Sequence, residues 1–313
     1  MRMEIFRNLS SIGTRCSSAV ALGFFDGLHI GHIELISSMI TYAQEHRLSA
    51  DIFTFSDHPK NAMSGTLAIP RLMTEAEKLD RLAALGVDRV FDFDFAHGFH
   101  TMSPDFFAHM MIKESFSAEA VFCGFNFRFG ADAAGDPKTL RELGRLYGYK
   151  TFVIKPVHLD GMLVSSSVIR RSINSGDAVT AGFMLGKDYS MTGVVEEGRR
   201  LGHTLGFPTA NITPDPQLTL PALGVYVTEV YAKGSRYRSV SNVGVNPTVA
   251  SGNAIRLETH LLGEDIELYG ETITVFLKKM LRAEQRFDNE EALKLQISSD
   301  VEAAKNYYRE HTD

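Results

Sequence analysis

The spacing of apolar residues changes once along this 313-residue chain, near residue 186. Before that point, the apolar runs SAVALGFF, RVFDFDF, EAVFCG and TFVIKPV alternate with helical patterns, which is typical of parallel strands joined by crossover helices. After it, GVYVTEVYA, RYRSVSNVG, RLETHLL and ETITVFL follow one another with turn residues between them, Lys233-Gly234-Ser235 being the clearest hairpin. We therefore predict an α/β domain with a parallel sheet over residues 1–186 and a small, mostly β domain, expected to be a barrel, over residues 187–313.

Helix start signals fit this division. Thr74 and Glu77 have the spacing of a capping box, and Ser103-Pro104 and Asp136-Pro137 each place a capping residue before a first-turn proline. The first helix is expected to begin at or beside His32, and its apolar stripe consists of Ile36, Met39, Ile40 and Ala43.

The chain is expected to close with a helix. Asp288 and Glu291 form a cap-like pair before a stripe of apolar residues, which should pack on the barrel: Leu293, Ile297, Val301 and Ala304.

Composition excludes several classes of protein. No stretch approaches the roughly 20 apolar residues of a membrane span, and SAVALGFF runs into Asp26 without a cleavage signature, so we expect a cytoplasmic protein with no membrane partner. A net charge of -6 argues against nucleic acid as a partner, although local basic groups could hold a small phosphorylated ligand. Cys16 and Cys123 form neither a disulfide framework nor a metal cluster, and we expect both thiols to be buried or half-buried.

The stretch GFFDGLHIGH, residues 23–32, places two histidines where an apolar run gives way to a helix. A strand that ends in glycines and turns into a helix presents backbone N–H groups and a positive dipole, which together suit a phosphate. His29 and His32 would lie on one side of this turn and donate hydrogen bonds to a transferring phosphoryl group. Taken alone, the spacing fits two ordinary half-exposed histidines equally well, and it fits zinc less well, because helical zinc-binding histidines are four residues apart.

Three further motifs extend the pattern. GFFDGLHIGH resembles the G-x-F-D-G-x-H-x-G-H signature of the nucleotidyltransferase superfamily. Class I aminoacyl-tRNA synthetases share the last four letters of this signature. They also carry a lysine-rich loop, which has no match in this chain. VFCGFNFRFG and LVSSSVIR resemble two signatures of one branch, the bacterial bifunctional riboflavin kinase/FAD synthetases, and LGFPTANI resembles the P-T-A-N signature of their kinase domain. The resemblance runs from about residue 15 to about residue 310, and it implies a Rossmann-like nucleotidyltransferase domain followed by a six-stranded kinase barrel with a C-terminal helix.

The same residues have plainer interpretations when each motif is taken alone. Three serines before a helix that carries Arg170 suit nucleotide phosphates but also describe a capped surface helix. The aromatic residues of GFNFRFG favour a core role over ligand contact. Pro208 and its neighbours are ordinary turn formers, and Glu258, between Leu257 and Thr259 in a strand, fits a solvent-facing carboxylate.

The resemblance implies a role for each motif residue. It makes His29, His32 and Arg170 catalytic in the first domain and Glu258 the catalytic base in the second. The implied ATP and phosphate contacts are Gly23, Phe24, Asp26, Gly31, Asn126, Ser165, Ser166, Ser167, Gly206 and Pro208. The implied flavin contacts are Phe125, Arg128 and His58, and the implied ligands of Mg²⁺ are Thr209 and Asn211.

The chain departs from the family pattern at four places. Asn126 stands where the family often has aspartate, and Asp57 replaces the first proline of a T-F-x-P-H-P segment. His203, preceded by Gly202, stands where arginine is usual, and it lacks the fixed fork of a guanidinium, a loss that Arg199 and Arg200 could offset. Gly263 stands where aspartate is common.

The implied activity is bifunctional: phosphorylation of riboflavin to FMN by ATP in the C-terminal domain, and adenylylation of FMN to FAD, with release of pyrophosphate, in the N-terminal domain. The expected partners are riboflavin, FMN and ATP, with Mg²⁺ as cofactor; no signal for an oligomeric state is present. Two alternatives stay open at this point: an enzyme with one activity whose other domain is structural, and a flavin-binding regulator without turnover.

Overall fold

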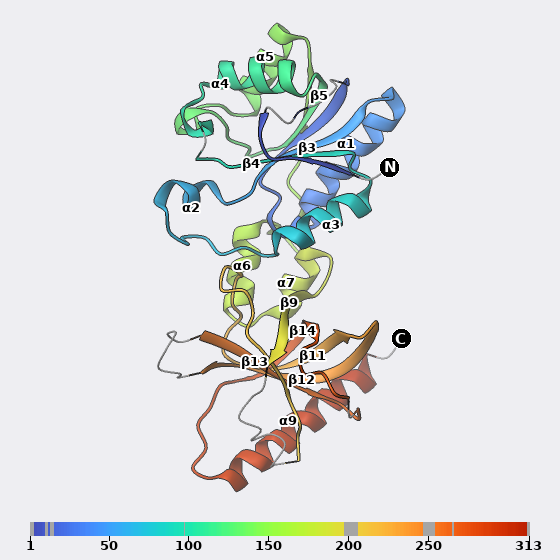
Figure 1. Ribbon diagram of the computed structural model, residues 1–313, viewed down its shortest axis with the longest axis vertical. Coiled ribbons are helices and arrows are strands. Elements are labelled where there is room, and N and C mark those ends of the chain that lie inside the picture. Colours follow the sequence, from blue (N-terminus) through green and yellow to red (C-terminus); the bar gives the residue numbers. More distant parts are fainter. Residues whose placement is uncertain are drawn as a thin grey trace. The chain divides into compact units, whose positions relative to one another are not determined.

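A computed structural model describes residues 3–9, 12, 16–96, 98–196, 206–246, 254–264 and 266–311. Its internal contacts divide the chain into two units, Met1–Ser165 and Ser166–Asp313, which are described one at a time (Figure 1). The division places helices α6 (Ser166–Asn174) and α7 (Ala178–Leu185) in the second unit. The boundary near residue 186 stays a prediction about the folding domains.

The first unit is built on a six-stranded sheet in which every neighbouring pair is parallel, as the alternating pattern predicts. In spatial order the strands are β1 (Glu4–Phe6), β4 (Arg89–Phe93), β3 (Ser49–Phe55), β2 (Ser18–Leu22), β5 (Ala118–Gly124) and β6 (Lys150–Ile154). A two-stranded hairpin follows, made of β7 (His158–Leu159) and β8 (Met162–Leu163). The α/β class of the first half is confirmed.

Helices cover both faces of this sheet, so the inner strands β2 and β4 are buried along their whole length. In β2, Ala19 and Ala21 face α1 (Ile30–His46) and α3 (Glu75–Leu85), while Val20 and Leu22 face the opposite layer. That opposite layer contains α4 (Pro104–Phe106), the π-helical segment η4 (Phe107–Ser115) and α5 (Pro137–Tyr147). The short helix α2 (Pro59–Ser64) follows β3, and single 3₁₀ turns lie at η2 (Asp26–Leu28), η3 (Phe99–Thr101) and η5 (Ala131–Ala133).

The strand order reverses at β2. The chain adds β3 and then β4 on one side of β2, and it later adds β5 and β6 on the other side. Leu22, the last residue of β2, is in register with Phe53 of β3 and with Cys123 of β5. In open parallel sheets, ligands bind outside the carboxyl ends of the strands at such a switch point. The segments that follow β2 and β5 therefore begin at the position where this architecture forms a ligand site.

The predicted helix caps are confirmed. Thr74 and Glu77 form a reciprocal capping box, and the side chains of Ser103 and Asp136 accept hydrogen bonds from the first turns of α4 and α5. The predicted stripe of α1 is buried at all four positions, Ile36, Met39, Ile40 and Ala43. Two expectations need correction: α1 begins at Ile30 with His29 as its cap, two residues before His32, and the Cys16 thiol is exposed, although that of Cys123 is buried.

The second unit contains a closed antiparallel barrel of six strands, which confirms the architecture expected for the second half. The strands follow one another around the barrel as β10 (Ala210–Ile212), β13 (Ala254–Leu261), β12 (Ser235–Asn246), β11 (Gly224–Ala232), β14 (Thr272–Ala283) and β9 (Tyr189–Glu196). The predicted hairpin joins β11 to β12, and both of its turn residues, Lys233 at φ 48° and Gly234 at φ 79°, have the left-handed conformation of a tight hairpin turn.

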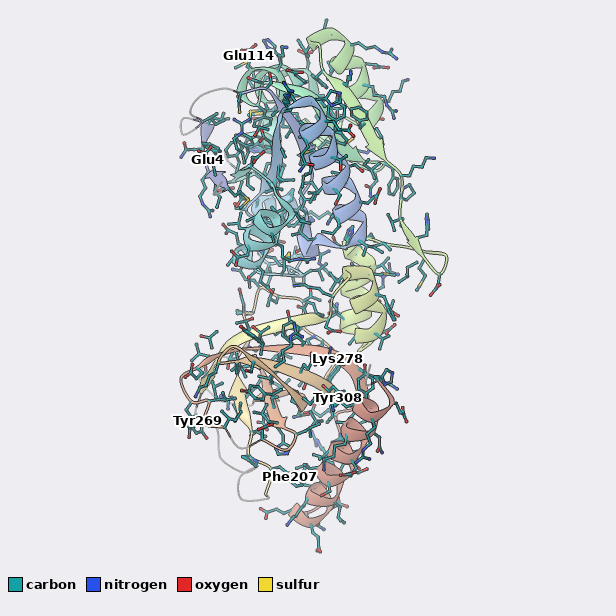
Figure 2. All side chains as sticks on the ribbon, turned by 90° about the vertical axis from the view of Figure 1, so that its right-hand side faces the viewer. Glu4, Glu114, Phe207, Tyr269, Lys278 and Tyr308 are labelled. Carbon is teal, nitrogen blue, oxygen red and sulfur yellow. The ribbon has the colours of Figure 1, made fainter. Side chains whose placement is uncertain are left out.

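The C-terminal helix α9 (Glu290–Glu310) packs on the barrel as predicted. Val301 and Ala304 join Val225 and Val227 of β11 in one apolar cluster. Tyr308, labelled in Figure 2, belongs to the same cluster, and its hydroxyl donates a hydrogen bond to a backbone carbonyl of β11. The expected cap is wrong by one residue: Asn289, rather than Asp288, accepts the hydrogen bond of the first turn, from the N–H of Ala292.

Helices α6 and α7 are attached to the barrel by backbone and side-chain contacts. The N–H of Ala222 donates to the carbonyl of Ile173 at 3.2 Å. Gly176, at φ 85°, lies so close to β14 that a β-carbon there would be 2.3 Å from the sulfur of Met280. Met184 and Leu185 of α7 are buried, and α7 packs against β9 and β14. These two helices thus stabilise the barrel unit.

This packing predicts that a fragment of residues 166–313 is more stable than one of residues 187–313. Loss of burial at Met184 and Leu185 alone is expected to cost about 3 to 6 kcal/mol, at roughly 1.5 to 3 kcal/mol for each side chain. The shorter fragment should melt at least about 5 °C lower in a thermal unfolding experiment followed by circular dichroism. Equal melting temperatures would show that the barrel does not depend on α6 and α7.

Candidate functional site

The turn between β2 and α1 is held in an unusual backbone conformation. Phe25, Gly27 and Leu28 have positive φ angles of 54°, 80° and 43°. A β-carbon on Gly23 would lie 2.8 Å from the Phe25 ring, so glycine is required where the ring folds back over the end of β2. Such a conformation persists only where its surroundings fix it.

Two polar side chains fix the turn, one within it and one from α3. The carboxylate of Asp26, only 4% exposed, accepts a hydrogen bond of 2.9 Å from the N–H of Leu72. The guanidinium of Arg81, on α3, donates to the carbonyls of Gly27 at 3.2 Å and Leu28 at 3.5 Å. Asp26 was predicted as a phosphate contact, and the structure gives its carboxylate this anchoring bond.

His29 and His32 lie together at the N-terminus of α1. Their rings stack with centroids 3.6 Å apart, and Nδ1 of His29 accepts a hydrogen bond of 3.2 Å from the backbone N–H of His32. Because Nδ1 of His29 is an acceptor, the proton of its neutral ring is on Nε2, where it can be donated to a ligand. A β-carbon on Gly31 would come within 3.3 Å of the His29 ring, so glycine leaves room for the imidazole.

Both imidazoles are neutral near pH 7. Burial lowers the pKa of His29 to about 4. The pKa of His32 is held well below its usual range, first by burial and then by the neighbouring His29. A helix N-terminus with two desolvated N–H donors suits a phosphate group, because the dipole and the donors act in the same direction. The structure thus brings together the two histidines, Gly23 and Gly31, as predicted.

The segment after β5 begins beside this turn. Gly124 is the residue after Cys123, just as Gly23 is the residue after its register partner Leu22. Asn126 folds back toward Gly124, where its side-chain oxygen would be 3.4 Å from an added β-carbon, and both Asn126 and Arg128 are exposed.

The aromatic residues of this segment do not share one environment. Phe129 is 7% exposed and belongs to the core, Phe127 is half-buried and stacks on it, and Phe125 is 43% exposed. The expectation that all three are core residues is therefore wrong for Phe125, because it lies in the turn beyond the end of the strand. Its exposed ring is available to a planar ligand.

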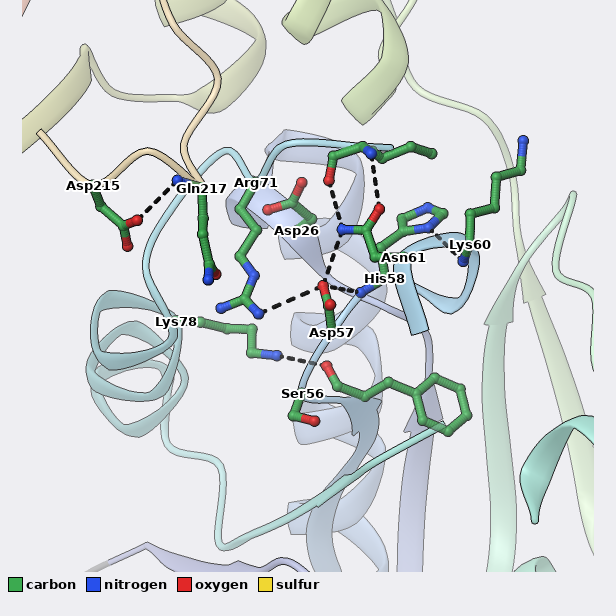
Figure 3. A network of polar contacts seen from close by, with 12 residues as sticks. Asp26, Ser56, Asp57, His58, Lys60, Asn61, Arg71, Lys78, Asp215 and Gln217 are labelled. Carbon is green, nitrogen blue, oxygen red and sulfur yellow. Dashed lines mark hydrogen bonds and ion pairs between the residues drawn. The ribbon is translucent and has the colours of Figure 1, made fainter. Parts of the chain in front are cut away.

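The carboxylate of Asp57, which replaces a proline, organises the segment after β3 (Figure 3). Its Oδ1 atom accepts hydrogen bonds from the N–H of His58 at 2.7 Å and from the amide of Asn61 at 3.1 Å, and it lies 3.5 Å from the guanidinium of Arg71. Asn61 in turn bonds both the N–H and the carbonyl of Ile69, at 2.8 and 2.9 Å. Hydrogen bonds thus fix the backbone here.

His58 caps α2, because its Nδ1 accepts a hydrogen bond of 3.1 Å from the N–H of Lys60. Its ring meets the ring of Phe24 edge to face, with centroids 5.1 Å apart. A residue predicted to contact flavin therefore lies next to one predicted to contact ATP.

Sequence reasoning missed Lys78. Its ammonium group is buried beside the carboxyl end of β3, where it donates to the carbonyl of Phe55 at 3.2 Å (Figure 3). It also lies 3.8 Å from the carboxylate of Asp92. Burial lowers the pKa of Lys78, and the charge of Asp92 opposes that shift. A signal was present, since Lys78 and Leu82 are four residues apart on the buried face of α3.

The SSSVIR motif spans the division between the units. Ser165 is the last residue of the first unit, and Ser166 and Ser167 begin α6 in the second. Arg170 is half-buried and is the fifth residue of α6. It therefore lies in the second helical turn, whereas the sequence suggested the first.

In the second unit, three polar side chains form one row across the barrel wall. Asn211 of β10 is in register with Glu258 of β13, which is in register with Asn242 of β12. Leu257 and Thr259 are buried, at 0% and 1% exposure, so Glu258 between them points outward and is exposed. Directly paired residues share a face of the sheet, so all three side chains line the outer wall.

Thr209 lies beside Asn211, two residues earlier in the chain. The amide of Asn211 is 3.5 Å from the hydroxyl of Thr209 and 3.4 Å from its carbonyl. The structure therefore places the two predicted metal ligands side by side and puts Asn211 opposite the predicted base, Glu258.

Thr209 is part of the lining of two cavities. One, of about 260 Å³, has both charged and apolar walls: Phe207, Thr209, Val225, Val240, Ser241, Asn242, Glu258, His260, Arg282, Glu284, Gln285, Phe287, Leu293, Ile297 and Asp300. The other, of about 510 Å³, is lined by Val195, Pro208, Thr209, Ala210, Thr259, Leu261, Glu264, Ile266, Glu267, Leu268 and Tyr269. A substrate in each cavity would meet the other substrate at Thr209.

The glycines near this site have turn conformations. Gly206 has φ 90°, and Gly263, where the family commonly has aspartate, has φ 80° in the turn after β13. Glycine adopts this backbone conformation without strain. The predictions for His203, Gly202, Arg199 and Arg200 concern positions outside the described residues.

Comparison with known proteins assigns the two halves. The FAD synthetase family matches residues 12–168, and the riboflavin kinase family matches residues 185–308. This chain is 30% identical to the bifunctional riboflavin kinase/FMN adenylyltransferase of Buchnera aphidicola from Acyrthosiphon pisum, with 99% of both chains covered. It is 33% identical to the enzyme of the same name from Escherichia coli K12, with 98% of both chains covered. This chain belongs to the bifunctional riboflavin kinase/FMN adenylyltransferase family.

A solved structure agrees with the fold. A crystal structure described as a macrolide-efflux protein from Streptococcus pneumoniae is 30% identical and has a TM-score of 0.89, with 98% of this chain and 99% of that one covered. In the part of this chain that the structure describes, no helix has the length and apolar character needed to cross a membrane. The family expected from the motifs is confirmed in both halves.

Burial of the histidine pair predicts how it titrates. In an NMR titration of the intact protein, the ring of His29 should take up a proton with a midpoint near pH 4, and that of His32 should take up a proton only well below the usual range of histidine. The unfolded chain binds this proton near pH 6.5, so His29 contributes stability above that pH, and the contribution is lost as the pH falls toward 4.

His29→Asn serves as the control, because asparagine retains a capping oxygen and does not titrate. The variant should lose less stability than the wild type between pH 6.5 and 4. A wild-type midpoint near 6.5 would mean that the imidazole of His29 is solvated in solution.

Proposed function

We propose how the side chains described above divide the work of the two reactions. The chain is a transferase with two activities, phosphorylation of riboflavin to FMN and adenylylation of FMN to FAD. We assign the first reaction to the barrel and the second to the switch point of the parallel sheet, with the boundary between the folding domains near residue 186. The order of the domains along the chain is then opposite to the order of the reactions.

The 260 Å³ cavity is the proposed riboflavin site. Its apolar walls, which include Phe207, Val225 and Ile297, suit a planar ring system, and Glu258 provides a carboxylate on the same surface. The larger cavity beyond Thr209 is the proposed ATP site, with Gly206 and Pro208 belonging to the segment that leads into it. The ribityl 5′-hydroxyl would then reach the γ-phosphate of ATP at the border that Thr209 forms.

Glu258 acts as general base in this proposal. It takes the proton of the 5′-hydroxyl as the oxygen attacks the γ-phosphorus, and the products are FMN and ADP. The observation that carries the assignment is the cross-strand row in which Glu258 stands between Asn211 and Asn242, at the wall of the cavity that also contains Thr209. The backbone pairing thus places Glu258 between two amide side chains on the same face of the barrel wall.

Thr209 and Asn211 would hold Mg²⁺. Hydroxyl and amide oxygens are suitable ligands for this hard cation, and two such side chains adjoin here, with phosphate oxygens expected to complete the coordination. Among the described residues, no cluster of three or more histidine, cysteine, aspartate or glutamate side chains offers a rival metal site. The bound ion would neutralise phosphate charge.

Adenylylation is assigned to the N-terminal domain, residues 1–186. The phosphate of FMN attacks the α-phosphorus of a second ATP, and pyrophosphate leaves. The Nε2–H of His29 and the ring N–H of His32, at the N-terminus of α1, stabilise charge on the phosphates, with Arg170 as a further cation and Ser165, Ser166 and Ser167 as hydrogen-bond donors. Gly23, Phe24, Gly31 and Asn126 line the nucleotide side, and Phe125, Arg128 and His58 the flavin side.

We further propose a cytoplasmic location, with the two flavins and ATP as the only partners required for catalysis. The net charge of -6 and the absence of a broad basic surface in the sequence support independence from nucleic acid.

Replacing both histidines should separate the activities. In His29→Asn/His32→Gln, FAD formation from FMN should fall by about 10²-fold or more, because donors aimed at developing charge typically contribute that much each. With riboflavin, ATP and Mg²⁺, the wild type should yield FMN and then FAD, whereas the variant should accumulate FMN, as measured by chromatography of the flavins. Loss of FMN formation in a folded variant would contradict the assignment of the histidines to adenylylation.

Glu258→Gln keeps the size of the side chain but removes the proton acceptor. Riboflavin phosphorylation should fall by roughly 10²- to 10⁴-fold, the usual contribution of a positioned acid or base, while FAD synthesis from supplied FMN is unchanged. If Glu258 were only a solvent-facing strand residue, both rates would be normal. Steady-state rates of the two reactions on the same preparation, with a thermal melt, distinguish these results from misfolding.

A further inference from the structure

His260 lies close to two residues of the proposed kinase site, Glu258 and Thr209. It lies on β13 two residues after Glu258, so both side chains project to the outer face of the strand. It lines the 260 Å³ cavity together with Glu258 and Thr209, and it is half-buried. The two-reaction proposal gives this imidazole no role.

The backbone pairing of β10 with β13 stops just before Thr209. The last register pair is Ala210 with Thr259, and β10 begins at Ala210. Continuing the register by one residue would place Thr209 opposite His260. Phe207, Pro208 and Thr209 lie outside this ladder in the described part of the chain, so they need another attachment to the barrel wall.

The imidazole of His260 provides that attachment. Its Nδ1 atom is 2.9 Å from the carbonyl oxygen of Pro208. A carbonyl only accepts hydrogen bonds, so Nδ1 must carry the proton and donate it. The same ring meets the ring of Phe207 edge to face, with centroids 5.5 Å apart.

Phe207, labelled in Figure 2, supplies the other end of this attachment. It packs against the apolar cluster formed by β11, β12 and α9, which includes Val225, Val240 and Val301. The backbone just before Thr209 is thus fixed by a hydrogen bond at Pro208 and by packing at Phe207. Proline has no N–H of its own, so its carbonyl is the group through which the backbone can be tied at this residue.

We infer that His260 is a positioning residue for riboflavin phosphorylation. By holding the carbonyl of Pro208, it fixes the Thr209 hydroxyl at the border of the two cavities and at a constant distance from Glu258. Displacement of a reacting group by about 1 Å can cost on the order of 10²-fold in rate. This inference rests on the proposed roles of Thr209 and Glu258.

The test compares two substitutions in the full-length chain. His260→Ala removes the hydrogen bond and the ring contact, and it should lower kcat for riboflavin phosphorylation by about 10- to 100-fold, with the KM for riboflavin changing by less than about threefold. His260→Asn places an amide donor near the position of Nδ1, and it should restore kcat to within about threefold of wild type. FAD formation from supplied FMN should be unchanged in both variants.

His311→Ala is the matched control. Nδ1 of His311 also lies 2.8 Å from a backbone carbonyl, that of Tyr307, and its ring also stacks on an aromatic ring, but it is at the exposed end of α9. Loss of this second imidazole should change neither rate. The control separates a bond that positions the site from the general loss of a histidine–carbonyl bond.

Three results would overturn the inference. Wild-type kcat in His260→Ala would show that the bond positions nothing. An equal loss in His260→Asn would show that the imidazole acts in a way that the hydrogen bond does not explain. Loss of both activities together with a lower melting temperature in both variants would reduce His260 to a structural role. If the wild type itself formed no FMN, the assignment of the kinase site would fail instead.

Discussion

The pairing of β2 with β3 on one side and β5 on the other determines where the first site is. Because β2 is central and is buried on both faces, helices must cover both sides of the sheet, α1 and α3 on one face and η4 and α5 on the other. The chain continues to opposite sides of β2, first to β3 and later to β5, so the crossovers diverge at its carboxyl end. The register of Leu22 with Cys123 then places Gly23 beside Gly124. The histidine turn and the exposed aromatic segment adjoin as a consequence of strand order.

Both sites lie where regular backbone pairing ends and side chains provide the next hydrogen bonds. At the end of β2, the carboxylate of Asp26 holds the N–H of Leu72, and the imidazole of His29 caps α1. At the start of β10, the imidazole of His260 holds the carbonyl of Pro208. Polar backbone groups left by the ending of a strand must be bonded, and a side chain that does this is itself held in one orientation. Precise placement of the groups proposed as catalytic follows from that requirement.

The sequence predicted the class of both halves, most strands, three helix caps and the family, because periodicity, capping spacings and motifs are local signals. It failed where a residue's environment depends on a distant segment. Lys78 is buried because α3 packs its face against β3 and β4, and Asp57 replaces proline through bonds to Asn61 and Arg71. Phe125 is exposed directly after the end of β5, whereas Phe129, four residues further on, pairs with Gly135 and joins the core.

Burial of the histidine pair has an energetic consequence for the adenylylation that we propose at this turn. With a pKa of about 4, protonating His29 at pH 7 costs about 4 kcal/mol, from roughly 1.4 kcal/mol for each pH unit. A unit negative charge about 4 Å away returns about 4 kcal/mol at an effective dielectric constant near 20. The neutral ring therefore becomes cationic only when charge greater than a single unit is close by, as on the pyrophosphate leaving group. Only the part of this stabilisation that is larger in the transition state than in the substrate-bound ground state speeds the reaction, and the rest tightens nucleotide binding.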